Sequence, residues 1–385
     1  MQANKPTSNK LLKSINQQKV LRLIFTDGPI SRVELAEKTG LTQQTITNIV
    51  NRLLQDRIVL EMTPTTSSVG RKPVPLIVDG SSMYAIGIEV AVQYIRGSLM
   101  DFQNKRIFEV KREKIDREGY PLAYMIQVVD ELLQHVPDQS RLQGIGCSIQ
   151  GLVDSKQGIV LYSPGLGYRD FPLRDRLEEK YGLPVLLDND VNLLALVENL
   201  NGRLAASQNN MTLKLDYGIG GAIVANNQLC SGANHVAGEF GHYKVVVGEQ
   251  AVKCHCGGKG CLTTIASISS LRRSGWKLDD FRTRVLEQEP EAITRFGSMI
   301  DGIGLALSNM ITMLNPEHVL VTGALVDAFR DTLIDAVKER IASSVPDTCK
   351  GVQIICLPET PNESISAAGL VMNDFFEVPL EQLSL

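Results

Sequence analysis

Three of the seven cysteines stand within eight residues of one another, in the stretch CHCGGKGC that begins at Cys254 and ends at Cys261. Thiolates at this spacing, together with one imidazole, satisfy the tetrahedral four-coordinate sites that zinc prefers. The glycines between them let the loop fold tightly around an ion. His242 upstream and His255 inside the stretch are the two candidates for the fourth ligand. Four protein ligands leave no open coordination position, so we predict a structural zinc ion that steadies the segment carrying Glu239 and His242.

The chain is too long for one simple core, and its 385 residues predict two or three domains. The amino-terminal stretch MQANKPTSNK is polar and lacks the apolar segment of a signal peptide. No uninterrupted apolar run reaches the length of about 18 residues that a membrane span needs. We therefore expect a cytoplasmic protein that does not insert into a membrane.

The charge is divided unevenly along the chain. Residues 1–75 hold eleven Lys or Arg residues and five Asp or Glu residues, a balance of +6. Because the whole chain carries −4, the remainder carries −10. Chance clustering of surface lysines would give the same division. A small basic module on an acidic body is nevertheless typical of a chain whose one end binds the phosphates of a nucleic acid.

A helix-turn-helix pattern begins at Ser31. Ser31 and Glu34 form a capping box, and Gly40 ends the short helix that follows. Thr42 then caps a second helix, whose apolar stripe consists of Ile46, Ile49, Val50 and Leu53. The preceding stretch supplies a third helix through the apolar residues Ile15, Val20, Leu21, Leu23 and Ile24. This succession of short helix, glycine turn and second helix predicts a DNA-binding module.

The face of the second helix opposite the stripe carries amides and hydroxyls that can bond base edges in a major groove. Beyond it, IVLEM and PLIVD predict two strands joined by the loop TPTTSSVGRKP, which together form a wing. GRKP alone would be a basic turn, but after a helix-turn-helix it resembles short Arg-Pro segments that lie in a narrow minor groove. The predicted DNA contacts are Gln43, Gln44, Thr47, Asn48 and Arg52 of the helix and Arg71 and Lys72 of the loop.

From Tyr84 onward strands and helices alternate, which predicts an α/β body with two lobes around a cleft. We expect helices near 121–135 and 173–181, a hairpin at 211–229 and late strands at HVLVTGAL and VQIICLP. One apolar strand ends in Asp188-Asn189-Asp190. A carboxylate there can serve as a general base toward a hydroxyl, with the adjacent amide fixing the substrate. A simple turn that closes a strand would use the same three residues.

Taken in order, the winged helix-turn-helix with GRKP, then LDNDVN, GEFGH and CHCGGKGC, resembles the ROK family of repressors, open reading frames and kinases. The resemblance covers essentially the whole chain and is greatest to the repressor branch, whose members respond to xylose, glucose-transport status or N-acetylglucosamine. It implies a two-lobed actin-like or hexokinase-like body of the ATPase type and a homodimer or tetramer.

The resemblance also assigns residues and domains. It implies that zinc is bound by His242, Cys254, Cys256 and Cys261, that a sugar is contacted by Asn189, Asp190, Glu239 and His242, and that Asp190 matches the kinase general base. The expected domains are a winged helix-turn-helix at 1–78, a small lobe at 83–195 that includes a carboxyl-terminal helix at 366–385, and a large lobe at 196–365 with the zinc site and the oligomerisation surface.

Two segments depart from the pattern of the active kinases in this family. The first phosphate loop, of Asp-Gly-Gly-Thr type in those kinases, reads Gly87-Ile88-Glu89-Val90-Ala91 here, and the second, normally Gly-Thr-Gly, reads Asp216-Tyr217-Gly218. Both changes set bulk or a carboxylate where triphosphate charge must be accepted. We therefore expect no phosphoryl transfer and regard Asp190 as a vestigial base.

Some sugar contacts of the family are changed as well. Thr263 stands where the zinc motif usually continues to a glutamate, Gln150 replaces a proline, and Gly165 replaces an asparagine. The sequence thus predicts a repressor of carbohydrate-utilisation genes that binds operator DNA and responds to a sugar inducer. The alternatives are a repressor captured by a sugar-transport protein and an active sugar kinase with a DNA-binding appendage.

Overall fold

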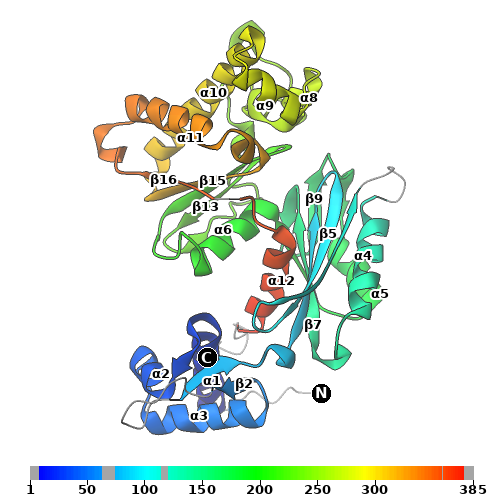
Figure 1. The fold of residues 1–385 in the computed structure, drawn as a ribbon, viewed down its shortest axis with the longest axis vertical. Coiled ribbons are helices and arrows are strands. Elements are labelled where there is room, and N and C mark those ends of the chain that lie inside the picture. Colours follow the sequence, from blue (N-terminus) through cyan, green and yellow to red (C-terminus); the bar gives the residue numbers. More distant parts are fainter. Residues whose placement is uncertain (1–7, 63–73, 114–119, 358, 377–385) are drawn as a thin grey trace. The chain divides into compact units, whose positions relative to one another are not determined.

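The computed structural model describes residues 8–62, 74–113, 120–357 and 359–376, and the chain divides into two compact units. The first unit comprises Met1–Asp188 with Glu363–Leu385, and the second comprises Asn189–Asn362. Figure 1 shows the helices and strands of both units and labels those for which there is room.

The amino-terminal part of the first unit is a winged helix-turn-helix. Its elements are α1 (Ser8–Asp27), β1 (Ile30–Ser31), α2 (Arg32–Thr39), α3 (Gln43–Gln55), β2 (Val59–Glu61) and β3 (Pro75–Val78). Strand β3 pairs antiparallel with both β1 and β2, so the two predicted wing strands are present. The loop between them includes residues 63–73, so the predicted contacts Arg71 and Lys72 lie outside the described residues.

The local signals of this module act as the sequence predicts. Ser31 and Glu34 form a reciprocal capping box on α2, and Gly40 closes that helix in the left-handed conformation. The Thr42 side chain caps α3. All four stripe residues of α3 are buried, and they form one core with Val20, Leu21 and Ile24 of α1.

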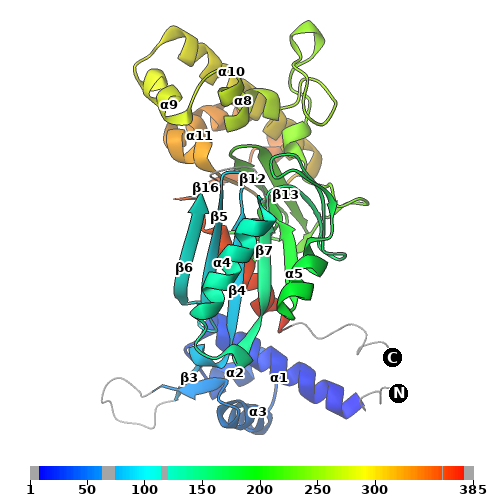
Figure 2. The same ribbon diagram turned by 90° about the vertical axis from the view of Figure 1, so that its right-hand side faces the viewer.

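The body of the first unit is built on a five-stranded sheet of order β11-β7-β4-β5-β6. Its strands are β4 (Tyr84–Val90), β5 (Tyr94–Asp101), β6 (Arg106–Glu113), β7 (Leu142–Ile149) and β11 (Val185–Asn189). A three-stranded sheet adds β8 (Leu152–Asp154), β9 (Ile159–Ser163) and β10 (Tyr168–Phe171). The helices are α4 (Leu122–Gln134), α5 (Leu173–Tyr181) and α12 (Glu363–Asp374). Helices α4 and α12 cover opposite faces of the larger sheet (Figure 2).

Helix α12 lies directly on strands β4 and β7. A Cβ atom at Gly87 would come within 1.8 Å of the Ser364 carbonyl oxygen, so only glycine permits this approach. Near the start of the helix, Ser148 Oγ donates a hydrogen bond to Glu363 Oε2 at 3.0 Å, and the hydroxyls of Ser98 and Ser364 lie 2.7 Å apart. The amino-terminal end of α12 is therefore fixed to the sheet by buried polar contacts.

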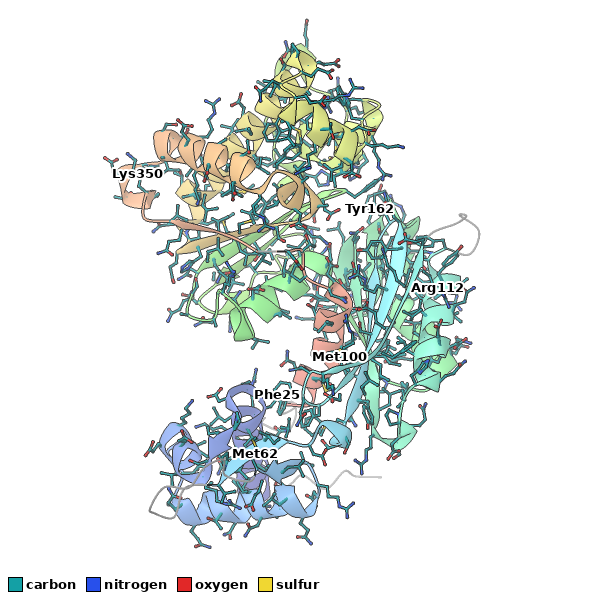
Figure 3. The ribbon with its side chains drawn as sticks, in the orientation of Figure 1. Phe25, Met62, Met100, Arg112, Tyr162 and Lys350 are labelled. Atoms are coloured by element: carbon teal, nitrogen blue, oxygen red, sulfur yellow. The ribbon has the colours of Figure 1, made fainter. Side chains whose placement is uncertain are left out.

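The other end of α12 belongs to the core of the winged module. The Phe25 ring of α1 lies 5.3 Å from the Phe102 ring at the end of β5 and 5.1 Å from the Phe376 ring that follows α12. The Phe102 and Phe376 rings are 6.0 Å apart. Met100 joins the same cluster, and Figure 3 labels it and Phe25 at this junction. One continuous apolar core thus joins the DNA-binding module to the body of its unit.

The second unit has its own five-stranded sheet of order β14-β13-β12-β15-β16. Its strands are β12 (Asn210–Leu215), β13 (Ile219–Ala225), β14 (Gln228–Leu229), β15 (His318–Thr322) and β16 (Gln353–Cys356). The helices are α6 (Asp190–Asn201), α7 (Thr263–Ala266), α8 (Ile268–Arg273), α9 (Leu278–Leu286), α10 (Pro290–Leu314) and α11 (Ala324–Ser344). Counted along the chain, both five-stranded sheets have the strand order 3-2-1-4-5, so the two units repeat one topology.

The compact units differ from the predicted domains at two boundaries. The second unit begins at Asn189 and not at residue 196, because α6 packs Val191 and Ala195 against β13 of that unit. The carboxyl-terminal helix was expected at 366–385, but it starts at Glu363 and ends at Asp374. Residues 377–385 lie outside the described part of the chain.

Helix α10 is long and apolar enough to cross a membrane by length and composition. Within its most apolar window 56% of the residues are buried, and residues along its length, from Ala292 to Ile311, belong to the core of the second unit. Such burial is typical of the central helix of a globular domain.

Candidate functional site

The cysteine loop of the second unit brings the predicted metal ligands together. His242 and the three cysteines each offer a ligand atom, and these four atoms all lie within 4.8 Å of one another. The loop is held closed by a hydrogen bond from the Cys254 amide to the Gly258 carbonyl oxygen at 2.8 Å. Gly260 has a φ of 70°, and a Cβ there would meet the Val246 carbonyl oxygen at 1.8 Å, so this turn requires glycine.

The distances within the cluster suit a tetrahedral ion. Zn–S bonds of about 2.3 Å at tetrahedral angles place two sulfurs about 3.8 Å apart. The Sγ atoms of Cys256 and Cys261 are 3.7 Å apart, and Cys254 Sγ lies 3.5 Å from His242 Nδ1. His255 Nδ1 lies 3.8 Å from Cys254 Sγ, but the group of mutually close ligand atoms comprises His242 and the cysteines. The geometry therefore favours His242 over His255.

Lys244 is a member of this site that the sequence analysis missed. Its Nζ lies 2.7 Å from Cys261 Sγ, and this hydrogen bond, together with the charges of the cysteines, raises the pKa of the lysine. A Zn²⁺ ion with three thiolates and a neutral imidazole carries a net charge of −1. The ammonium group can balance that charge. The isolated bridge between Lys244 and Cys261 places the lysine there, and its position two residues after His242 was the available signal.

His242 connects the cysteine cluster to a carboxylate. Its Nδ1 faces Cys254, whereas its Nε2 lies 3.6 Å from Glu239 Oε2. Burial, followed by the charge of Asp190, raises the pKa of Glu239 to about 7. Burial also lowers the pKa of His242. Phe240, which is buried in the core of the unit, anchors the short turn that carries both side chains.

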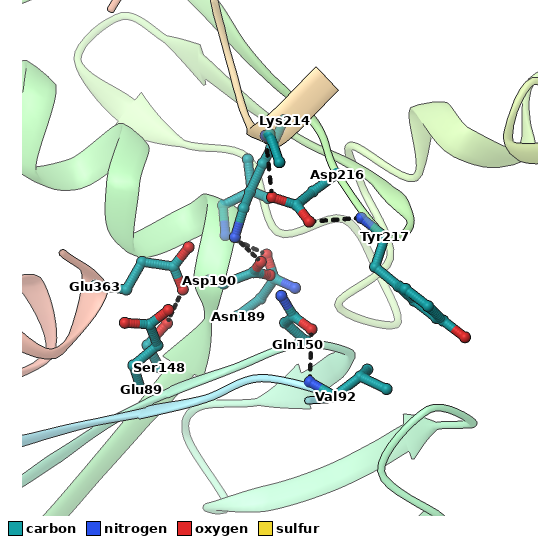
Figure 4. A network of polar contacts seen from close by, with 12 residues as sticks. Glu89, Val92, Ser148, Gln150, Asn189, Asp190, Lys214, Asp216, Tyr217 and Glu363 are labelled. Atoms are coloured by element: carbon teal, nitrogen blue, oxygen red, sulfur yellow. Dashed lines mark hydrogen bonds and ion pairs between the residues drawn. The ribbon is translucent and has the colours of Figure 1, made fainter. Parts of the chain in front are cut away.

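Asn189 and Asp190 stand at the start of α6. The Asn189 side chain caps this helix by accepting hydrogen bonds from the amides of Val191 and Asn192. Asp190 Oδ2 accepts a hydrogen bond from Lys214 Nζ at 2.8 Å, and both side chains are buried (Figure 4). The four predicted sugar contacts thus belong to one unit, and the charges of Asp190 and Glu239 influence one another.

Lys214 was also missed by the sequence analysis. It lies in β12, where all six residues are buried. A lysine between two leucines of a strand is rarely buried unless it has a partner, and this was the signal in the sequence. The Asp190 carboxylate, predicted to match the kinase general base, is thus bonded to a cation of the chain itself.

The segment Asp216-Tyr217-Gly218, where the active kinases of the family have their second phosphate loop, forms hydrogen bonds of its own. Asp216 accepts hydrogen bonds from the amide of Tyr217 at 2.6 Å and from the amide of Ala324 at 3.3 Å. Ala324 is the first residue of α11, and the amino terminus of a helix is a site where phosphate commonly binds. The chain's own carboxylate therefore lies at the end of the helix that a phosphate group would approach.

The segment at residues 87–91, where the active kinases of the family have their first phosphate loop, lies in the first unit. Glu89 is buried near the end of β4, where its Oε1 accepts a hydrogen bond from the Tyr94 hydroxyl at 2.5 Å. Arg96 Nε lies 3.7 Å from Glu89 Oε2. The Gln150 side chain, which replaces a proline, accepts a hydrogen bond from the Val92 amide at 3.1 Å (Figure 4).

The predicted DNA-binding face of α3 is exposed for the most part. Gln43, Gln44, Asn48 and Arg52 are exposed, and Thr47 is half-buried. Gln44 Nε2 donates a hydrogen bond to Asn48 Oδ1 at 3.3 Å, so the two amides lie side by side on one face. The α3 stripe packs into the core on the opposite side of the helix.

Comparison with known proteins identifies the family. A sequence profile described as the ROK family matches residues 85–372. The chain belongs to the ROK family. A second profile, described as winged helix-turn-helix DNA-binding, matches residues 13–59.

Individual relatives include both regulators and an enzyme. The xylose repressor of Bacillus subtilis (strain 168) is 28% identical over 373 residues, which cover 93% of this chain and 94% of that protein. A glucokinase of Halalkalibacterium halodurans is 31% identical over 298 residues, 71% of this chain and 90% of the kinase. The crystal structure of a ROK family transcriptional regulator, a homolog of the Escherichia coli MLC protein, aligns with a TM-score of 0.79 at 24% identity and covers 95% of this chain and 97% of its own. The predicted winged helix-turn-helix and actin-like body are therefore confirmed.

Proposed function

We propose that this ROK-family chain is a cytoplasmic transcriptional repressor of carbohydrate-utilisation genes, which binds operator DNA and releases it in response to a sugar. The observation that carries the proposal is the exposed amide face of α3, on a winged module that shares its core with helix α12 of the body. Relatives named as repressors align over nearly the whole chain, which supports the same function.

The chemistry of the α3 face suits a DNA major groove. Gln and Asn side chains can pair with adenine through two hydrogen bonds, and Arg52 near the end of the helix can bind a phosphate. Arg71 and Lys72, predicted wing contacts, would add minor-groove binding. Because each module reads one half-site, we propose that the repressor acts as a homodimer, or as a tetramer of two such dimers, on a palindromic operator.

Replacement of Gln44 or Asn48 by alanine should cost about 1–3 kcal/mol of discrimination between the operator and altered base pairs. Replacement of Arg52 by alanine should weaken binding to all sequences and reduce the salt dependence by about one charge. Gel-shift or anisotropy titrations at several salt concentrations measure both effects. Gln134→Ala, an exposed amide on α4, is the matched control. Equal affinity of the Gln44 and Asn48 variants for every site would refute the assignment of this face.

Asn189, Asp190, Glu239 and His242 are proposed to hold the sugar. A polyol removed from water needs a hydrogen-bond partner for each hydroxyl, and these side chains offer carboxylate, amide and imidazole groups. A sugar can release DNA only if it binds more tightly to the state that does not bind DNA.

The decisive experiment is binding of the purified protein to DNA from upstream of its own gene and its neighbours, at fixed salt, with pentoses, hexoses and amino sugars. Tight binding that one sugar releases establishes the repressor and its inducer. Tight binding that no sugar affects favours capture by a sugar-transport protein as the signal, and absence of binding overturns the proposal.

We propose further that the cysteine cluster holds one structural Zn²⁺ ion per chain, bound by His242, Cys254, Cys256 and Cys261. The ligand types and the spacing of their atoms support this assignment. The ion would fix the loop next to Glu239, and Lys244 would balance the excess negative charge.

The variant Cys256→Ser should lose zinc, because a hydroxyl is a poor replacement for a thiolate ligand. Elemental analysis after dialysis should give one zinc per chain for the unaltered protein and close to none for the variant. Cys230→Ser, outside the cluster, is the control and should keep its metal. A Cys256→Ser protein that still carries one zinc contradicts this ligand set.

We infer that the chain does not transfer phosphate. The Asp216 carboxylate, bonded to the first amide of α11, would repel a triphosphate, and the Lys214–Asp190 ion pair withholds the base from a substrate hydroxyl. Incubation with ATP, Mg²⁺ and xylose, glucose or N-acetylglucosamine should therefore yield no sugar phosphate above background. The Halalkalibacterium halodurans glucokinase serves as the positive control. Steady turnover by the unaltered chain would show that it is a kinase.

A further inference from the structure

A cavity of about 820 Å³ lies in the second unit, apart from the residues proposed to hold sugar and zinc. Its walls come from α8, from the amino-terminal half of α10, and from the chain on either side of the cysteine loop. Val252, Ile265 and Pro290 form an apolar part of the lining, and serine and threonine side chains form much of the rest.

Two arginines line this cavity together. Arg273 ends α8, and Arg295 belongs to α10. Burial, and then the charge of Arg273, lowers the pKa of the Arg295 guanidinium, so the two cations lie close enough to disfavour one another. Glu291 at the wall opposes this effect in part. Among the ion pairs recorded within the described ranges, no acid pairs with either arginine.

The hydrogen bonds of these arginines leave donors for a ligand. Arg295 Nη2 donates to the Ser270 carbonyl oxygen at 3.1 Å, and Arg273 Nη2 donates to the Thr264 carbonyl oxygen at 3.4 Å. Arg295 Nε is buried and has no hydrogen-bond partner within residues 8–62, 74–113, 120–357 and 359–376. A buried guanidinium N–H without an acceptor is costly unless a bound molecule satisfies it.

We propose that this cavity is a second small-molecule site, which binds a phosphorylated metabolite with its phosphoryl group between Arg273 and Arg295. Glu291 offsets the charge of the two arginines only in part, and the several oxygens of a phosphoryl group can accept hydrogen bonds from both guanidinium groups at once. The volume exceeds that of a bare ion, and the apolar wall can cover the organic part of the ligand. This inference is independent of the proposed sugar response.

The occupant would lie next to the cysteine loop. Val252 precedes Cys254 by two residues, and Thr264 follows Cys261 by three. The Thr264 amide and hydroxyl both donate hydrogen bonds to the Cys261 carbonyl oxygen, at 2.8 and 2.7 Å. A ligand that contacts Val252 and Thr264 therefore touches both ends of the loop that carries the metal ligands.

Calorimetric titration of the full-length protein tests the proposal with four probes: glucose 6-phosphate, inorganic phosphate, glucose and gluconate. Glucose 6-phosphate should bind, and Arg273→Gln should weaken its binding at least tenfold. Arg273 is exposed, so this variant should fold. Arg295→Lys, which keeps the charge but loses the forked donors, should weaken binding as well. Arg340→Gln, an exposed arginine on α11 outside the cavity, is the matched control and should bind as the unaltered protein does.

Several outcomes would overturn the proposal. Failure of both phosphate probes to bind at millimolar concentration rules out a phosphoryl site. Equal affinity in the Arg273→Gln and control proteins places the ligand elsewhere, and loss of binding in Asp190→Asn alone assigns it to the sugar residues. Gluconate that binds as tightly as glucose 6-phosphate, and is equally sensitive to Arg273→Gln, contradicts the preference for a phosphoryl group.

Discussion

Replacement of Phe102 by alanine is expected to lower the free energy of unfolding of the first unit by about 3–5 kcal/mol. The ring is fully buried, and it contacts Phe25 of the winged module as well as Phe375 and Phe376 beyond α12. The cavity left by the variant would lie in the core that joins the two parts. The winged module should then unfold at a lower denaturant concentration than the body, which circular dichroism and limited proteolysis can follow together.

The matched control is Phe108→Ala. Phe108 is half-buried on the edge strand β6, where its ring stacks on His135. Its loss should cost about 1 kcal/mol, the typical effect of a substitution outside a tight core. If Phe102→Ala and Phe108→Ala have equal effects, the aromatic cluster does not hold the winged module to the body.

Replacement of Lys214 by methionine is expected to destabilise the second unit by about 3–5 kcal/mol, because it leaves the buried Asp190 carboxylate without its cation. Methionine has a similar length and keeps the strand packed. Urea denaturation of the variant measures the loss. The double variant Lys214→Met with Asp190→Asn should recover most of the stability, since it removes both charges together.

Further variants test whether the loss of stability comes from the ion pair itself. Asp190→Asn alone removes the carboxylate to which Lys214 is bonded and should also destabilise the unit. Lys338→Met, an exposed lysine on α11, is the control and should change stability by less than about 0.5 kcal/mol. If the double variant loses as much free energy of unfolding as the two single variants together, Lys214 and Asp190 do not stabilise each other.

The parts of the fold that follow from short-range chemistry could be predicted from the sequence. The capping box at Ser31, the close of α2 at Gly40 and the cap at Thr42 depend on residues a few positions apart. Helix α5 has the predicted bounds, because the apolar pattern ends at a glycine in the left-handed conformation. The cysteine cluster was evident for the same reason, since three of its four residues are close in sequence.

The residues that escaped prediction depend on distant contacts. Lys214 meets Asp190 across 24 positions, and only the packing of β12 beside α6 brings them together. The start of the helix expected at 366–385 was placed three residues late because the contacts of Glu363 and Ser364 with the sheet, which begin α12, join residues more than 200 positions apart. The cavity between α8 and α10 likewise has no sequence signature, because its arginines are 22 positions apart on different helices.

The aromatic junction around Phe102 also limits which fragments and domain fusions of this protein can fold. A fragment limited to the winged module would expose Phe25 and its neighbours to water, and it would be prone to self-association. Transfer of the module onto a kinase body would need a matching aromatic surface on the acceptor's last helix. The winged module therefore depends on the carboxyl-terminal segment of the chain, and a fusion that moved it onto another protein would have to supply that segment as well.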